Sequence, residues 1–290
     1  MSRQGATPTI TRVTMLAVVA AVALPAAAQA RVIETVSVAR SANVPSGETR
    51  SFTLKCPARA VALNGAATTE LEAADSIPGG NARRWTFRFT AGATAKTGRA
   101  VLRCVRLRLP KRVKGVGLAV ETKIEPIFEV PAGSTQSVGV RCSRGTIPTG
   151  WGLKRTGAGN GLAIAAAKPT KRGWAFVVEN TGNTGAAGTV YARCLERKQR
   201  ATSGQTHAFS TRVASFTEQL EGPGTTRRSC RGSEYSVSTG VSLPAADDIV
   251  LTGTGPHAQR EGEWSFAQPN GTIGVRTSIV CLAKTTGFHR

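Results

Sequence analysis

Six cysteines, spaced as three pairs, constrain this chain more than any other feature of its sequence. The stretch VPSGETRSFTLKCP (44–57) aligns without gaps with VPAGSTQSVGVRCS (130–143), and Cys230 opens a third, more divergent unit. The interval from first to second cysteine is closely similar in all three units: Cys56 to Cys104, Cys142 to Cys194, and Cys230 to Cys281. Because self-similarity at a fixed period marks a repeat architecture, the sequence predicts three homologous units.

Each unit carries the same further marks in the same order between its two cysteines. A glycine comes first, a proline follows it, and a W-x-F motif comes next. The glycines are Gly65, Gly150 and Gly240, and the prolines are Pro78, Pro169 and Pro256. The aromatic pairs are Trp85 and Phe87, Trp174 and Phe176, and Trp264 and Phe266. An asparagine stands six residues after the tryptophan in the second and third units, as Asn180 and Asn270.

The repeat also predicts how the cysteines pair. Six cysteines allow 15 pairings. Pairing within units, as Cys56–Cys104, Cys142–Cys194 and Cys230–Cys281, lets every unit close in the same way. In the chain-entropy model a disulfide that closes a loop of this length stabilises the fold by about 4 kcal/mol.

Alternating side chains predict strands throughout the units, and we find no helical periodicity after the N-terminal segment. Phe52, Leu54 and Cys56 share one face, as do Trp85, Phe87 and Phe89. Short strands separated by Gly, Pro, Asn and Thr are typical of β-sandwiches. We therefore predict an all-β chain of three tandem β-sandwich domains, each closed by one disulfide. They are immunoglobulin-like only in the loose sense, because the tryptophan lies near the second cysteine rather than the first.

The predicted domain boundaries follow the repeats. Residues 1–30 form a signal peptide, and the three repeats cover 31–112, 113–203 and 204–290. The stretch RGWAFVVENTG (172–182) by itself suits either an aromatic binding platform or a buried strand. Since it is one of three copies, we expect Trp174 to pack beside Cys142–Cys194 and all six motif aromatics to be core residues.

The arrangement resembles a repeat of secreted actinobacterial proteins of unknown function. The resemblance lies in a first cysteine, a glycine-containing turn, W-x-F-x-x-x-N and a final cysteine, best seen in the second and third units. The first unit departs from it, with Ala91 in place of the asparagine. The resemblance implies secretion and disulfide-closed β domains, and it brings no catalytic residues with it.

The N-terminal segment has the pattern of an export signal. Arg3 and Arg12 precede an apolar stretch from Val13 to Leu24, and an A-x-A site ends at Ala30. An uncleaved membrane anchor is the alternative, but twelve apolar residues are short for a bilayer. We expect export with cleavage after Ala30, to the cell envelope or the extracellular space, and no transmembrane segment in the mature chain. Three disulfides suit that oxidising location.

The chain is strongly basic, with 38 Lys and Arg against 17 Asp and Glu. Removing residues 1–30 removes two basic residues, so the mature charge is 36 − 17 = +19. Such a charge favours anionic partners, although the Arg-, Ala- and Gly-rich composition of a GC-rich genome would also produce it. The charge is uneven: 31–117 carries 16 − 5 = +11, 118–206 carries 12 − 5 = +7, and 207–290 carries 8 − 7 = +1.

The densest basic run is RAVLRCVRLRLPKRVKG (99–115), which contains no acidic residue. The candidate anion-binding residues in it are Arg103, Arg106, Arg108, Lys111, Arg112 and Lys114. We hypothesise that they bind an anionic cell-wall or extracellular polymer. The alternative is a solvated strand between domains whose apolar side packs on its neighbour. The run has no aromatic residue for base stacking, which disfavours sequence-specific nucleic-acid binding.

Motifs for catalysis are missing from the sequence. His207, His257 and His289 lie far apart, with no second ligand at metal-binding spacing, and there is no C-x-x-C. No G-x-S-x-G motif or phosphate-binding loop occurs, and Asp is found only at positions 75, 247 and 248. The sequence thus predicts a secreted, non-enzymatic interaction or envelope-associated protein without cofactor or metal. A hydrolase whose active site is built from unrecognised loops is the alternative. The sequence does not indicate an oligomeric state.

Overall fold

The computed structural model confirms an all-β, disulfide-bearing sandwich fold. It describes residues 33–69, 71, 73–107, 117–156, 161–200, 206–244, 249–267 and 272–285. The predicted signal peptide, the predicted boundaries at 112/113 and 203/204, and Asn270 lie outside these residues. Within the described part of the chain no helix is long and apolar enough to span a membrane.

Each repeat contributes strands at six successive positions, which we call a to f. The first repeat forms β1 (Ile33–Val44), β2 (Thr49–Lys55), β3 (Val61–Thr69), β4 (Ala73–Pro78), β5 (Arg84–Thr90) and β6 (Lys96–Leu107). In the second repeat position a is split into β7 (Val120–Ile124) and β8 (Phe128–Val130). Positions b to f are β9 (Thr135–Arg141), β10 (Thr146–Thr156), β11 (Leu162–Thr170), β12 (Gly173–Asn180) and β13 (Ala186–Glu196).

The third repeat is preceded by a short extra strand, β14 (Lys198–Arg200). Its six positions are β15 (Thr206–Leu220), β16 (Gly224–Ser229), β17 (Tyr235–Ser242), β18 (Val250–Pro256), β19 (Glu261–Ala267) and β20 (Ile273–Thr285). The strands predicted around the cysteines and the W-x-F motifs are all present, because their side chains alternate between core and solvent as the sequence pattern requires.

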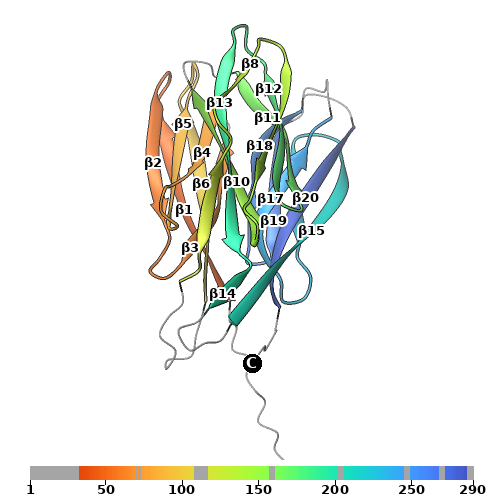
Figure 1. Cartoon of the computed structure of the whole chain (residues 1–290). Coiled ribbons are helices and arrows are strands. Elements are labelled where there is room, and N and C mark those ends of the chain that lie inside the picture. Colours follow the sequence, from red (N-terminus) through yellow and green to blue (C-terminus); the bar gives the residue numbers. More distant parts are fainter. Residues whose placement is uncertain are drawn as a thin grey trace, which may run out of the picture.

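The repeats do not lie end to end as three separate sandwiches, because every sheet is shared by two of them (Figure 1). The first sheet has the order β1-β6-β3-β18-β19-β16 and joins positions a, f and c of repeat one to d, e and b of repeat three. The second, β2-β5-β4-β10-β13-β7, joins repeats one and two in the same way, and β8 also pairs with β13. The third, β14-β15-β20-β17-β11-β12-β9, joins repeats two and three. The arrangement is therefore cyclic, with pseudo-threefold order.

Few backbone pairings connect one repeat to the next within a sheet. In each sheet a c strand meets the d strand of another repeat, and the bridges are Thr68–Gly253, Ser76–Leu153, and Ala166–Ser242 with Ala167–Val241. The three c strands β3, β10 and β17 also contact one another. The Trp151 indole N–H, on β10, donates to the Thr239 carbonyl, on β17, at 2.8 Å. Side-chain packing among the c strands therefore supplements this sparse pairing.

The hydrophobic core is divided in the same shared manner. Repeats one and three each enclose a cluster around their own disulfide. The largest cluster contains the core of repeat two together with residues of both other repeats, namely Ile33, Val61, Leu63, Val105, Phe209, Val237, Val280 and Leu282. Because this cluster takes side chains from all three repeats, no repeat can bury its full apolar surface alone.

The three disulfides form as predicted: Cys56–Cys104, Cys142–Cys194 and Cys230–Cys281. In each repeat the first cysteine follows strand b and the second lies on strand f, which belongs to another sheet. The disulfides thus connect the three sheets in pairs around the molecule. Disulfides of this kind indicate an oxidising environment outside the cytosol.

The W-x-F aromatics are core residues, as predicted. All six side chains are at most 3% exposed. Trp174 is buried in the same cluster as Cys142 and Cys194, so the stretch 172–182 contains a core strand rather than an aromatic platform. The Asn180 side chain is buried as well, and its amide donates to the carbonyls of Val130 and Thr184, which holds the turn after β12.

The three glycines that the sequence alignment equates do not occupy one structural position. Each c strand has a β-bulge, and Gly150 lies at it, whereas Gly65 and Gly240 follow it by one and two residues. Gly65 makes room for Trp85, because a Cβ there would lie 2.2 Å from the indole nitrogen. The glycines therefore serve local packing instead of one common turn.

Candidate functional site

The predicted basic patch is only partly a surface. Arg103 is 1% exposed, so its inclusion in a binding surface is wrong. Because side chains alternate along a strand, Arg103 points to the other face of β6 from Cys104, away from the core of repeat one. Residues of repeat three cover that face. Its guanidinium donates to the Ala258 carbonyl, in the hairpin between β18 and β19. The sequence of repeat one alone gives no sign of this cover.

Arg193 occupies the matching position in repeat two, directly before the second cysteine, and is buried too. It donates to the Thr122 hydroxyl at 2.7 Å and to the Gly79 carbonyl at 3.3 Å, in the hairpin between β4 and β5. Burial lowers the pKa of both arginines to about 10. Both side chains thus connect one repeat to a hairpin of another, and they are structural residues.

Arg106 is engaged by its own strand partner. Its guanidinium donates to both carboxylate oxygens of Glu34, at 2.7 and 3.0 Å, and this pairing raises its pKa. The other four candidates, Arg108, Lys111, Arg112 and Lys114, lie outside the described residues. Their part in the anion-binding patch therefore stays a prediction.

Arginines recur instead in the connections at one end of the molecule, which we call the basal end. Strands β3, β10 and β17 all begin at this end, each directly after the turn that follows the first cysteine of its repeat (Figure 1). It is the lower end in Figure 1, near β14. The turns after the first cysteines (57–60, 143–146 and 231–234) and the d–e hairpins (79–83, 171–172 and 257–260) lie here.

Each of these six basal connections carries an arginine. In the turns they are Arg59, Arg144 and Arg231, all exposed. In the hairpins they are Arg83, Arg172 and Arg260. The hairpin arginines are fixed by the backbone, because each accepts a hydrogen bond at its carbonyl from the N–H of the first cysteine, at 2.7–2.9 Å. Arg83 and Arg260 also donate through their side chains to the carbonyls of Cys56 and Cys230.

The opposite end differs in charge. Its described connections are 45–48, 131–134, 221–223, 91–95 and 181–185, and they contain Glu48 and Glu221 but no Lys or Arg. The basal connections contain one acidic residue, Glu234, which pairs with Arg212. The connections at the two ends of the strands therefore differ in charge. Sequence comparison missed this because the turn arginines stand three, two and one residues after their cysteines, so a gapless alignment does not superpose them.

An open pocket lies at the basal end of repeat two. It has a volume of about 420 Å³ and is lined by Glu121, Ser143, Arg144, Gly145, Thr146, Glu196, Arg197 and Lys198. Glu121 holds the turn after Cys142: it accepts hydrogen bonds from the Ser143 N–H at 2.8 Å and from the Ser143 and Thr146 hydroxyls. Burial opposes ionisation of Glu121, but these bonds and Lys123 outweigh it and lower its pKa.

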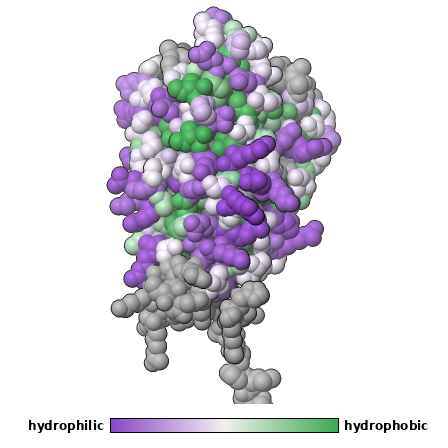
Figure 2. Space-filling model, in the orientation of Figure 1, coloured by the Kyte–Doolittle hydropathy of each residue, from purple (hydrophilic) through white to green (hydrophobic). Residues whose placement is uncertain are grey.

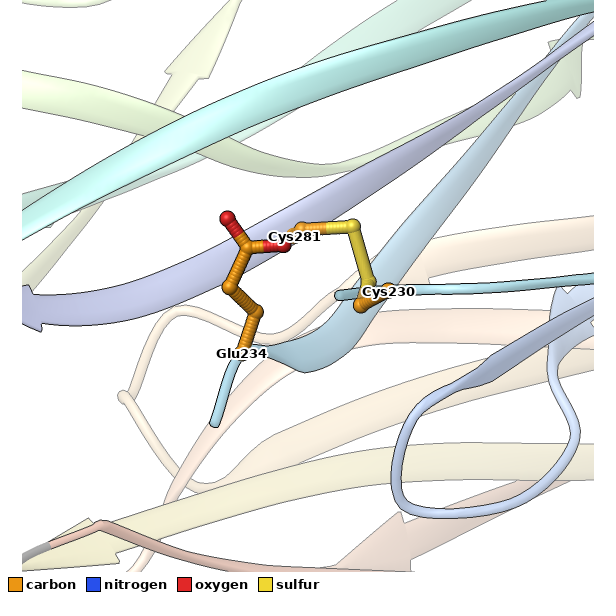
Figure 3. Close-up of side chains that lie close together, drawn as sticks. All are labelled: Cys230, Glu234 and Cys281. Atoms are coloured by element: carbon orange, nitrogen blue, oxygen red, sulfur yellow. A yellow bond between two sulfur atoms is a disulfide. The ribbon is translucent and has the colours of Figure 1, made fainter. Parts of the chain in front are cut away.

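A possible metal cluster proves to be a disulfide site. Within the described residues, the one group of His, Cys, Asp and Glu with ligand atoms close enough for a shared metal is Cys230, Glu234 and Cys281 (Figure 3). Both sulfurs are bonded to each other, so no thiolate is free to bind a metal. Glu234 is paired with Arg212, whose Nε donates to it at 2.9 Å.

Apolar docking surface is scarce on the face in view. Figure 2 shows hydrophilic residues over most of that face, with hydrophobic residues in small groups. Among the described residues the large hydrophobic side chains that are exposed are Ile124, Ile127 and Val213. Charge, rather than apolar area, is thus the main surface feature.

No protein-family model matches the chain, and the search of curated proteins returns no match. Function has to be argued from the geometry.

Proposed function

We propose that the mature chain is an exported, non-enzymatic protein of the cell envelope or extracellular space that binds an anionic polymer through its basal end. The observation that carries the proposal is the charge polarity. Each of the six basal connections named above has an arginine, and the described connections at the opposite end have no basic residue. A cluster of like charges on one end attracts a polyanion and orients it toward that end.

Three further features support the proposal. The Arg- and Lys-rich N-terminal two thirds of the mature chain reaches the basal end at several points, including the exposed pair Lys171 and Arg172. The disulfides are typical of proteins outside the cytosol, and the N-terminal pattern of residues 1–30 is typical of an export signal. The turn arginines come from three repeats, so a long polymer can contact several of them at once, which raises its overall affinity.

A retention experiment on cell-wall material and on a soluble polyanion tests this function. In the basal variant, Arg59→Gln, Arg144→Gln and Arg231→Gln remove one exposed charge from each basal turn. In the matched control, Arg50→Gln, Arg99→Gln and Arg276→Gln remove three exposed charges from strands near the opposite end. We expect the basal variant to elute at clearly lower salt than both the wild type and the control. Equal elution of the two variants would refute binding through the basal end.

A further inference from the structure

The pocket of repeat two has cations on its rim that make no ion pair with any described residue. Arg144, Arg197 and Lys198 are exposed, and none has a side-chain hydrogen bond or ion pair to a residue that the structure describes. In the first repeat, by contrast, Arg106 follows the second cysteine and is neutralised by Glu34. The pocket therefore offers positive charge that is not already used.

The backbone fixes where these three side chains leave the fold. Arg144 and Arg197 come from segments far apart in the sequence, but the Arg197 N–H donates to the Gly145 carbonyl at 2.9 Å. The turn that carries Arg144 is held by Glu121, which takes three hydrogen bonds from Ser143 and Thr146. Lys198 begins β14, which pairs with β15. The backbone of the rim is thus preorganised before any ligand arrives, which reduces the entropy cost of binding.

The pocket also contains acceptors, which narrows the class of ligand. Glu196 lines it, and no described residue donates to the Glu196 side chain. Glu121 already accepts three hydrogen bonds and is paired with Lys123, which balances its charge. A ligand that fits must place an oxyanion near the three cations and offer hydroxyl donors to Glu196. A hydroxylated sugar that bears a carboxylate or a phosphate has both groups.

We propose that this pocket is the subsite for one anionic sugar unit, with Arg144, Arg197 and Lys198 binding its carboxylate or phosphate and Glu196 accepting from its hydroxyls. The inference rests on the proposed function, because the sugar would be a unit of the bound polymer. A volume of about 420 Å³ lies within the range of small-molecule sites.

Titration of the mature, disulfide-bonded protein with small ligands, followed by NMR shifts and calorimetry, tests the proposal. The probes are glucuronate, glucose 6-phosphate, inorganic phosphate and glucose. The pocket variant carries Arg197→Gln and Lys198→Gln, and the matched control carries Lys171→Gln and Arg172→Gln, another adjacent basic pair at the same end. We expect one or both charged sugars to bind, with affinity at least tenfold lower in the pocket variant and changed less than twofold in the control.

The probes distinguish a carboxylate ligand from a phosphate ligand. Preference for glucuronate identifies a carboxylate polymer, and preference for glucose 6-phosphate identifies a phosphate polymer. The subsite would be refuted if neither charged sugar binds, or if both variants lose the same affinity. It would also be refuted if inorganic phosphate binds as tightly as glucose 6-phosphate while glucuronate does not bind. If the subsite fails while the triple basal variant still loses polymer retention, the proposed function stands without it; if that retention is unchanged too, both are refuted.

Discussion

Asp75 forms buried ion pairs at the contact between repeats one and two. Its carboxylate is 2% exposed and meets Arg88 at 2.6 Å and Arg155 at 3.0 Å, so it joins β4 of one repeat to β10 of the next. Arg155 is itself largely buried. Removing one partner of a buried ion pair is costly, because the other charge is left without compensation.

Asp75→Asn should therefore lower the free energy of unfolding by about 3 kcal/mol or more, measured by chemical denaturation. Glu48→Gln is the control, since the Glu48–Arg50 pair is half exposed and such pairs contribute about 0–1 kcal/mol. An equal, small effect of both substitutions would show that the buried pair does not stabilise the junction.

Glu121 makes the stability of the fold depend on pH. Its pKa is lowered in the folded protein, so its bonds to Ser143 and Thr146 stabilise the fold above the ordinary glutamate pKa. That contribution is lost as the pH falls through the lowered value. We expect the Ser143 amide resonance to titrate below the ordinary pKa of about 4.3. A midpoint at or above that value would contradict the role given to Glu121.

Single residues show which features of the fold have a local signal in the sequence. Period-two alternation places Trp85, Trp174 and Trp264 in the core, and the repeat predicts all three disulfides, because both are properties of a single unit. Arg103 has the same alternation signal as an exposed residue. It is buried by a hairpin of another repeat, and a contact of that kind has no local pattern in the sequence.

The c strands β3 and β10 approach each other closely at a glycine. Gly150 lies at the bulge of β10, where a Cβ would be 2.0 Å from the Leu63 carbonyl oxygen of β3. Any side chain there would push the two strands apart. Close packing of c strands from different repeats thus needs glycine at this point.

We predict that Gly150→Ala lowers the unfolding free energy by about 1–3 kcal/mol, the usual range for overpacking. Gly139→Ala, on β9, is the matched control, because its Cβ would lie 3.8 Å from the nearest atom, the Trp174 carbonyl oxygen. Calorimetric unfolding of both variants measures the difference. Tolerance of alanine at position 150 would mean that β3 and β10 are less closely packed than described.

The sequence predicts the strands themselves well, but not the sheets they join. Hydrophobic alternation marks β2, β5, β9 and β12 because each packs on its own repeat's core. The exchange between repeats depends on bridges such as Ser76–Leu153, a single pair with no distinctive residue type. Tandem sandwiches and a cyclic set of shared sheets therefore have the same sequence signature.

The shared sheets make the folding of each repeat depend on the other two. Repeat two alone, residues 113–203, would lose the strands that β10 and β11 pair with and the apolar side chains that complete its core. We expect this fragment, with its disulfide formed, to be unfolded or to assemble as a trimer that restores the missing pairings. Circular dichroism and size-exclusion chromatography decide this, and a cooperatively folded monomer would contradict the mutual dependence.

The same cyclic order places three turn arginines at one end, and this is the basis of the functional account. The exposed residues Arg59, Arg144 and Arg231 come from different repeats, yet all lie where the c strands begin. Repetition of a unit thus builds a basic end from one arginine per turn. The basic run at 99–115, which the sequence singles out first, contributes Arg103 to the interior and Arg106 to an ion pair with Glu34.

Binding through the basal end is tested by the salt dependence of the protein's affinity for a linear polyanion such as heparin. Binding that releases counterions makes log K fall linearly with log salt concentration, and the slope falls by roughly one for each basic contact removed. We predict a shallower slope for the Arg59→Gln, Arg144→Gln, Arg231→Gln variant. The Arg50→Gln, Arg99→Gln, Arg276→Gln variant should keep the slope of the wild type. Identical slopes in all three proteins, or a loss confined to the second variant, would contradict binding through the basal end.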